Sequence, residues 1–379
     1  MLSTGRRKLQ AGNLSAQNQR FARRVVLTTY KAPLYSAPVE AFARAAAATA
    51  PRVATLAQVM QLVQPHLNEV DARITQQAAA FDPAIEGYVS YAIGGRGKRL
   101  RPLMALLAGG ATGEISSSHV DLAVIVELIH LATLVHDDIL DEAERRRAQP
   151  TVNARWGNSL SVLLGDCLFA HALTLAANFE NAEISRAIAR TASQVCSGEM
   201  IQTQRRFDLQ LRVADYLQIV EMKTGWLFAT AAELGATISG ADAAIVRLLR
   251  QFGMGIGTAY QIYDDCLDLA GTEAGTGKTL GTDLQKGKFT LPVLMFLQTA
   301  SAFERERCSA LIVDGRTDEV TELLKNGATN GALNSSIATG VNLIREAQAT
   351  LASMPANRYA DALLMLGEAL TEMLDQLRV

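Results

Sequence analysis

Six aspartates occur as two copies of one acidic pattern, DDxxD, more than a hundred residues apart. They are Asp137, Asp138 and Asp141 in the first acidic motif and Asp264, Asp265 and Asp268 in the second. On a helix the first and last carboxylates of each motif are one turn apart, about 6 Å along the axis, and project from the same face. Like charges this close repel one another unless a cation lies between them. We expect magnesium, which binds through one or two carboxylates plus substrate phosphates.

The alternative interpretation is a pair of solvated acidic helix faces, because runs of charge usually face water. The residues before each motif are largely apolar, Leu131 to Val135 in the first case and Tyr260 to Tyr263 in the second. This context favours a metal site in a partly buried setting over a solvated surface.

Cationic residues stand on both sides of the first acidic motif. Upstream, a glycine-rich turn places Lys98 and Arg101 three residues apart at the start of a predicted helix, where they can converge on one phosphate group. Downstream, Arg145, Arg146 and Arg147 can clamp phosphate oxygens through bidentate hydrogen bonds. Each group also has a plainer interpretation, the first as a solvated loop and the second as partners for nearby glutamates.

Isolated polar residues lie within apolar helical segments. His130 stands two turns before Asp137 on the same predicted helix face, either as a ligand contact or as a satisfied core residue. Lys223 and Thr224 form a polar pair in an otherwise apolar predicted helix, Tyr216 to Leu234. A buried lysine needs a partner, and a bound anion would provide one.

Two lysines follow the second acidic motif at regular distances. Lys278 lies ten residues after Asp268, and Lys288 lies another ten residues on, after a glycine-rich stretch. A loop of this length can bring both ammonium groups back over the metal site, so we include both lysines in the candidate site.

The composition predicts a helical protein with a large core. Hydrophobic residues make up 49% of the 379 residues and prolines number only nine, while alternating β-branched runs typical of strands are absent. No segment has 18 uninterrupted apolar residues, so we expect a soluble chain without a membrane span. The four cysteines lack CxxC spacing, which indicates reduced thiols and no zinc site.

Charge is distributed unevenly along the chain. Residues 1–52 contain nine Lys or Arg and one acid, which leaves 27 basic and 37 acidic residues for residues 53–379. An acidic body argues against nucleic acid as a partner. We interpret residues 1–52 as a basic, poorly ordered extension and 53–379 as the catalytic domain. The protein is expected in the cytoplasm, or in the mitochondrial matrix if the arginine-rich, acid-poor extension is a transit peptide.

Taken together, the motifs resemble the trans-isoprenyl diphosphate synthases of the polyprenyl synthetase family. The likeness runs from roughly Tyr91 to Leu297 and is carried by GKRLRP, LVHDDILDEAERRR, PTVNARWGN, LLGD, EMKTGWLF, YQIYDDCLDLAG and GKTLGTDLQKGKFTLP. It implies an all-α fold, a single large bundle of long helices around a deep apolar cavity, and a homodimer. It also implies a magnesium-dependent prenyltransferase that condenses isopentenyl diphosphate with an allylic diphosphate.

The resemblance also implies a role for each motif residue. Isopentenyl diphosphate would be bound by Lys98, Arg101, His130 and Arg147. The allylic diphosphate would be held by Arg146, Lys223, Lys278 and Lys288. Magnesium would be liganded by Asp137, Asp141 and Asp264, with Asp138, Asp265 and Asp268 in support. The catalytic residues would be Lys223, Thr224 and Gln261, of which Thr224 and Gln261 would lie beside the reacting carbons.

Product length depends on the residues one turn before the first acidic motif, because the growing chain must extend past them into the bundle. In this chain those residues are Ala132 and Thr133, where early-terminating relatives tend to place a bulky aromatic. The hypothesis is a long-chain all-trans polyprenyl diphosphate, and Ala132→Phe should shorten it. We also expect a peripheral contact with a membrane when so apolar a product is released.

Three other functions share parts of this pattern. A short-chain farnesyl or geranylgeranyl diphosphate synthase shares the motifs but ends elongation earlier. A terpene cyclase would lack the intact second acidic motif and the basic turn at Lys98 and Arg101. A non-catalytic subunit of a heterodimeric synthase would have a degraded site, whereas all six aspartates are present here.

Overall fold

The described part of the chain is almost entirely helical. The structure, a computed structural model, describes residues 55–95, 97–146, 149–271, 281–325 and 329–378. Within these ranges the strands are β1 (Arg145–Arg146) and β2 (Gln149–Pro150), which pair antiparallel. The predicted all-α fold is confirmed. The predicted extension, residues 1–52, lies outside the described residues.

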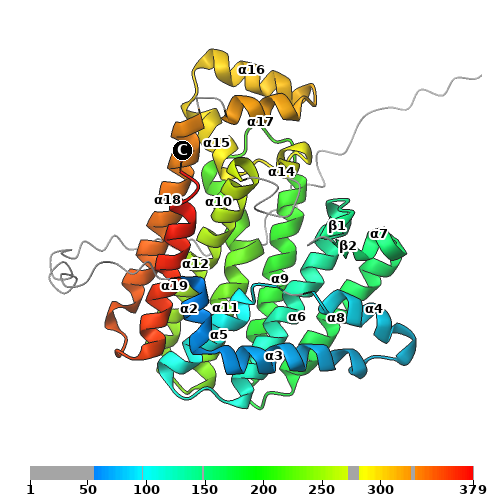
Figure 1. Cartoon of the computed structure of the whole chain (residues 1–379), viewed down its shortest axis with the longest axis vertical. Coiled ribbons are helices and arrows are strands. Elements are labelled where there is room, and N and C mark those ends of the chain that lie inside the picture. The colour runs from blue at the N-terminus through cyan, green and yellow to red at the C-terminus, as the bar shows by residue number, and fades with distance from the viewer. Residues whose placement is uncertain (1–54, 96, 147–148, 272–280, 326–328, 379) are drawn as a thin grey trace, which may run out of the picture. The chain divides into compact units, whose positions relative to one another are not determined.

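The helices of the first half of the chain provide one wall of the bundle and its lower end (Figure 1). They are α2 (Leu56–Leu62), α3 (Gln64–Gln76), η2 (Gln77–Ala80), α4 (Pro83–Ile93), α5 (Leu100–Thr112), α6 (Ser117–Leu140), α7 (Val152–Trp156), α8 (Asn158–Ala177) and α9 (Ala182–Gln204). In Figure 1, α3 runs across the lower end, while α6, α8 and α9 rise from it.

The helices of the second half complete the bundle. They are α10 (Val213–Val220), η3 (Glu221–Gly225), α11 (Trp226–Ile238), α12 (Ala243–Ala270), α14 (Thr282–Gln285), α15 (Leu291–Thr299), α16 (Ala302–Val313), α17 (Thr317–Lys325), α18 (Thr329–Thr350), η4 (Leu351–Ser353) and α19 (Arg358–Asp375). Figure 1 shows α16 and α17 as a hairpin at the upper end, and α18 and α19 side by side along one flank.

Local sequence signals set several helix boundaries. Thr55 and Gln58 form a capping box at the start of α2. Asp82 accepts a hydrogen bond from the Ala84 N–H at 2.8 Å, and Pro83 occupies the first position of α4. Asn357 caps α19 by accepting from the N–H groups of Tyr359 and Ala360 in its first turn. Such caps satisfy backbone donors that the helix itself leaves unpaired.

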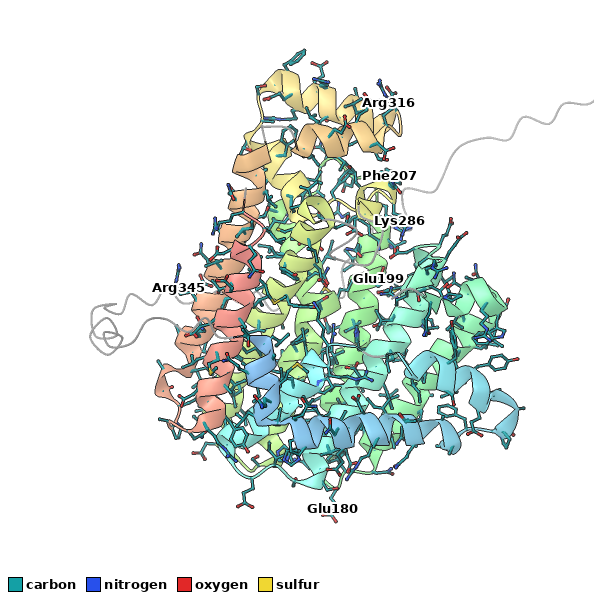
Figure 2. The ribbon with its side chains drawn as sticks, in the orientation of Figure 1. Glu180, Glu199, Phe207, Lys286, Arg316 and Arg345 are labelled. Carbon is teal, nitrogen blue, oxygen red and sulfur yellow. The ribbon has the colours of Figure 1, made fainter. Side chains whose placement is uncertain are left out.

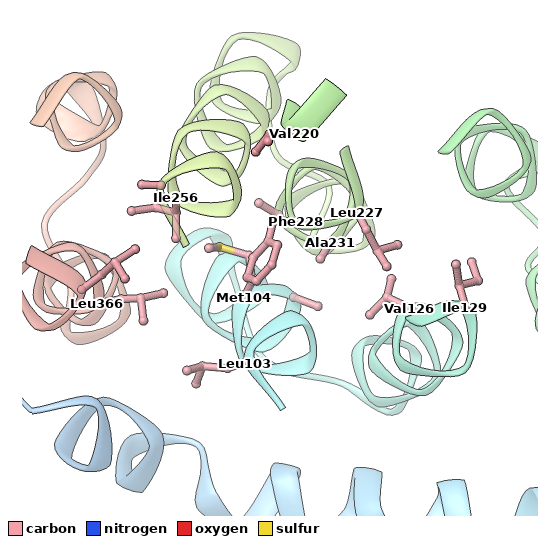
Figure 3. Packing of buried hydrophobic residues seen from close by; sticks show 14 of the residues in the cluster. Leu103, Met104, Val126, Ile129, Val220, Leu227, Phe228, Ala231, Ile256 and Leu366 are labelled. Atoms are coloured by element: carbon pink, nitrogen blue, oxygen red, sulfur yellow. The ribbon is translucent and has the colours of Figure 1, made fainter. Parts of the chain in front are cut away.

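The core lies where α11 packs between α5 and α12. Figure 3 shows Phe228 of α11 beside Met104 of α5, and both side chains are fully buried. Glycines permit the close approach: a Cβ atom on Gly235 would lie 2.4 Å from the Ala105 carbonyl oxygen, and one on Gly253 would lie 2.6 Å from the Phe228 carbonyl oxygen. Because both neighbours are backbone atoms, neither position can accept a side chain without moving a helix.

Two described helices, α6 and α8, are long and apolar enough to cross a membrane by length and composition alone. No membrane span was predicted from the sequence, because no segment has 18 uninterrupted apolar residues. Polar residues do interrupt the apolar run of α6, but the mean hydropathy of the helix is still as high as that of a membrane span. Buried core helices pass the same test, and 72% of the apolar window of α6 is buried within the fold. In α8 only 33% is buried, so its exposed apolar face requires another explanation.

Candidate active site

Both acidic motifs lie at the C-terminal ends of long helices. Asp137 and Asp138 are in the last turn of α6, Asp141 is its C-cap, and the second motif occupies the last two turns of α12. The C-terminal end of a helix carries partial negative charge from its unpaired carbonyl groups. Carboxylates placed there add to that negative charge, so the site requires cations.

Cationic side chains from other segments contact the first acidic motif. Lys288 Nζ lies 2.6 Å from one Asp141 oxygen and 2.8 Å from the other. Arg146, on β1, lies 2.8 Å from Asp138. Burial alone would raise the pKa of Asp141, but Lys288 outweighs it and holds that pKa below its usual range. For Asp138, burial prevails over Arg146 and the pKa is raised.

Lys223 reaches the first motif from a distorted turn. It lies in η3, a five-residue π-helical turn inserted between α10 and α11, a feature that is common at functional sites. Its Nζ donates to Gln202 Oε1 at 3.1 Å, pairs with Glu199 and lies 3.6 Å from Asp137. Burial alone would lower the pKa of Lys223, but the two carboxylates raise it, so the lysine is charged at neutral pH.

The second acidic motif is positioned by a chain of hydrogen bonds. Tyr216 donates to Asp265 at 2.5 Å, and the Gln261 amide donates to the same carboxylate at 2.9 Å. The Thr224 hydroxyl in turn donates to Gln261 Oε1 at 2.8 Å. Burial, reinforced by the nearby Asp283, raises the pKa of Asp265 to about 7. These bonds fix Gln261 and Thr224 relative to the motif.

A cavity of about 610 Å³ opens beside the two motifs and is lined by both polar and apolar side chains. The predicted site residues that line it are Lys98, Arg101, His130, Thr133, Asp137, Arg146, Lys223, Thr224, Gln261 and Asp264. The apolar lining includes Leu134, Leu140, Phe169, Val195 and Met200. Lys288 and Asp265 line a small adjoining cavity, which shares Lys223 and Gln261 with the large one.

The remaining predicted residues lie elsewhere. Asp138, Asp141 and Asp268 are close in sequence to cavity residues but are not part of its lining. Ala132 is fully buried and points about 100° around α6 from Thr133, so its part in chain length stays a prediction. Arg147 and Lys278 lie outside the described residues.

The two cations of the basic turn face aromatic rings. Lys98 Nζ lies 5.7 Å from the ring centre of Tyr260, and the Arg101 guanidinium lies 4.8 Å from that of Phe228. Burial lowers the pKa of Arg101, and its Nε has no hydrogen-bond partner among the described residues. A desolvated arginine beside a cavity binds an anion strongly because little water has to be displaced.

Arg99, between these two cations, also lines the cavity, but its guanidinium is paired with carboxylates from two other helices. It adopts a left-handed backbone conformation, with φ of 49°, at the N-cap of α5. Its guanidinium donates to Glu127 at 2.6 Å and to Asp71 at 2.7 Å. Glu127 and Glu199 could not be found from the sequence, because their partners come from other helices and leave no pattern along the chain.

The carboxylates suit a divalent metal, although they are not preassembled around one. Within the described ranges, no three His, Cys, Asp or Glu side chains are arranged as a metal-binding group. The first-motif carboxylates are instead paired with Lys223, Arg146 and Lys288. The donors are all oxygen atoms, which hard divalent cations prefer, and Asp137 and Asp264 both line the large cavity.

Comparisons with known proteins agree with this geometry. Residues 82–326 match the family described as Polyprenyl synthetase. The chain is 31% identical over 310 residues to an octaprenyl diphosphate synthase of Haemophilus influenzae, covering 82% of this chain and 94% of the relative. It is 39% identical over 267 residues to heptaprenyl diphosphate synthase component 2 of Geobacillus stearothermophilus, covering 69% and 81%.

A solved structure matches over nearly its whole length. This is a polyprenyl synthase from Caulobacter crescentus CB15 complexed with calcium and isoprenyl diphosphate, with a TM-score of 0.79 and 33% identity. The match covers 85% of this chain and 99% of that one. The chain therefore belongs to the polyprenyl synthetase family of trans-isoprenyl diphosphate synthases, and it is a prenyltransferase.

Proposed function

We propose that this prenyltransferase repeatedly condenses isopentenyl diphosphate with an allylic diphosphate to make a long-chain all-trans polyprenyl diphosphate. The observation that carries the proposal is the large cavity, which is lined by an aspartate of each acidic motif, by several cations and by apolar side chains. A relative that shares 31% of its residues is named for an octaprenyl product, and the one that shares 39% for a heptaprenyl product.

The two substrates bind to different sets of cations in and beside the cavity. We assign isopentenyl diphosphate to Lys98, Arg101 and His130, where two cations face the cavity beside aromatic rings. We assign the allylic diphosphate to Arg146, Lys223 and Lys288, which already contact the first acidic motif. Arg147 and Lys278 join these two sets by the family pattern alone.

We propose Mg²⁺ as the metal, held by Asp137, Asp141 and Asp264. When bound, it supplies the positive charge that stabilises the diphosphate as it leaves the allylic carbon. Lys223 and Arg146 add fixed positive charge at the same place and need no rearrangement as the negative charge develops. The leaving group takes the C–O bonding electrons, and the allylic cation remains in the cavity.

Bond formation follows on the Thr224 and Gln261 side of the cavity. The double bond of isopentenyl diphosphate supplies the electron pair for the new C–C bond, and the departed diphosphate accepts the proton that is lost. Hydrogen bonds between Thr224, Gln261 and Asp265 keep these side chains in fixed positions beside the reacting carbons. The apolar lining excludes water, which would otherwise capture the cation.

The exposed apolar face of α8 supports a homodimer. Val162, Leu163 and Leu173 are large apolar side chains on this helix, and Leu163 is 64% exposed. Contiguous apolar side chains on a surface mark interaction sites, and the same patch on two copies forms a two-fold interface. A heteromer is the alternative, because the heptaprenyl relative is named as one component of a synthase. This face could also lie against a membrane during product release.

One experiment tests the function directly. The purified chain is incubated with farnesyl diphosphate, isopentenyl diphosphate and Mg²⁺, and the products are identified by mass spectrometry. We expect long-chain polyprenyl diphosphates, and we expect chelation by EDTA to abolish and Mg²⁺ to restore the reaction. Mainly farnesyl or geranylgeranyl products would refute the long-chain proposal. A chain that is inactive alone would instead indicate one component of a heteromer.

A further inference from the structure

The turn after α9 places a second cation on Asp141. Arg206 Nη2 donates to Asp141 Oδ1 at 3.2 Å and to the Leu140 carbonyl oxygen at 3.2 Å, so it also caps the C-terminal end of α6. Its side chain is 23% exposed, and its Nε is buried without a hydrogen-bond partner among the described residues. Arg206 is not one of the cations that the family motifs assign to either diphosphate.

The neighbouring residue ties the same turn to the segment that carries Lys288. The Phe207 N–H donates to the Gly287 carbonyl oxygen at 2.8 Å. Its ring packs against Gly287, where a Cβ atom would lie 2.5 Å from it. Figure 2 shows Phe207 close to Lys286, near α14, with Glu199 lower on α9.

The backbone at Phe207 is held in an unfavourable conformation. Its φ is +60°, a left-handed value that costs a residue with a Cβ atom free energy and persists where surrounding contacts hold it. Here those contacts are made by Gly287, one residue before Lys288. Arg206 and Lys288, on two segments joined by this contact, therefore both pair with Asp141.

One carboxylate is then paired with two cations, next to residues that would bind a metal-diphosphate complex. A metal that takes the Asp141 carboxylate brings a diphosphate with several anionic oxygens. Arg206 has five donors, of which Nη2 makes the contacts described above and Nε makes none among the described residues. A guanidinium in this position can turn from the carboxylate to phosphate oxygens without leaving the turn.

We infer that Arg206 is a further cation of the allylic-diphosphate site, which holds Asp141 in place before substrate binds and then contacts the metal-bound diphosphate. This inference rests on the proposed assignment of the allylic site. It predicts that Arg206 determines affinity for diphosphate at the first acidic motif and leaves isopentenyl diphosphate binding at Lys98 and Arg101 unaffected.

The test compares Arg206→Gln with Arg205→Gln in the full-length protein. Arg205 lies in the same turn but pairs with Asp208 at 2.7 Å, so its replacement removes the same charge without touching Asp141. Calorimetric titration with inorganic pyrophosphate and Mg²⁺ should show affinity about tenfold or more weaker for Arg206→Gln, as expected for a lost charged hydrogen bond. Arg205→Gln should stay within about twofold of the wild type.

Arg206→Lys is a control for loss of the fold, because it keeps the positive charge and replaces only the planar guanidinium by an ammonium group. It should bind pyrophosphate with an affinity between those of the wild type and Arg206→Gln. In steady-state assays the KM for farnesyl diphosphate should rise in Arg206→Gln and the KM for isopentenyl diphosphate should not. Unchanged pyrophosphate affinity in both Arg206 variants, or an equal loss in Arg205→Gln, would overturn the inference. Products made by the wild-type chain test the proposed function separately.

Discussion

Replacement of Glu127 by leucine tests whether the buried ion pair behind the basic turn holds that turn in position. Glu127 and Arg99 have side chains only 4% and 8% exposed, and their nearest charged atoms are 2.6 Å apart. Arg99 Nε also contacts Asp71, at 2.7 Å, but Asp71 is 54% exposed. In Glu127→Leu the guanidinium stays buried and keeps only this partly solvated partner.

The expected loss follows from the energetics of buried charges. Removing one partner of a buried ion pair costs about 3–5 kcal/mol, because the other charge remains desolvated. We expect the lower part of this range, since Asp71 still contacts Arg99. For a folded region of about 310 residues, 3–5 kcal/mol corresponds to a melting temperature lower by about 5–8 °C. The double variant Arg99→Met with Glu127→Leu should recover most of the loss, because apolar replacements of a buried pair are often neutral.

Urea unfolding followed by circular dichroism gives the unfolding free energies of the two single variants and the double variant. The KM for isopentenyl diphosphate is measured in parallel and should rise in Glu127→Leu, because Arg99 lies between Lys98 and Arg101. A loss below about 1 kcal/mol in Glu127→Leu would refute the reasoning. So would a double variant that is less stable than both single variants.

Three further predictions concern the cavity, the α8 face and a buried histidine. Thr133→Phe should shorten the main product by at least one isoprene unit, as measured by mass spectrometry, because Thr133 lines the cavity. A stronger effect from Ala132→Phe would show that the growing chain extends along the other face of α6. If the proposed homodimer forms through α8, Leu163→Glu should convert it to monomer in sedimentation experiments, and an unchanged mass would place the interface elsewhere. Burial lowers the pKa of His119, so the folded state favours the neutral ring, and the unfolding free energy should fall as pH decreases below about 6.5. His119→Gln should flatten this dependence between pH 5 and 7, and an equally steep profile would contradict the assignment.

Much of the fold and of the site could be predicted because the signals are local. Helical periodicity and few prolines indicated an all-α chain, and the spacing within each DDxxD motif placed its carboxylates on one helix face. The polar pair Lys223 and Thr224 in an apolar segment indicated a buried site, and the structure places both on the cavity lining. The predicted helix from Tyr216 to Leu234 lies within a longer helical run from Val213 to Ile238, and the π-helical turn within it was not foreseen.

Residues whose function depends on partners from distant helices could not be predicted in this way. Glu199 looks like any polar residue of an amphipathic helix until η3 brings Lys223 against it. Arg206 belongs to a basic turn with no motif, and its contact with Asp141 spans 65 residues of sequence. Ala132 and Thr133 are adjacent in sequence, yet only Thr133 lines the cavity.

The sequence by itself determined the helical class, the two acidic motifs and the set of cations, because these depend on residue type and on spacing within one helix or turn. The tertiary structure decided which carboxylate pairs with which cation, which face of α6 lines the cavity, and that the guanidinium of Arg99 is held in a buried ion pair with Glu127. Ion pairs and cavities form between helices that are distant in sequence, so only their packing fixes the distances on which binding depends.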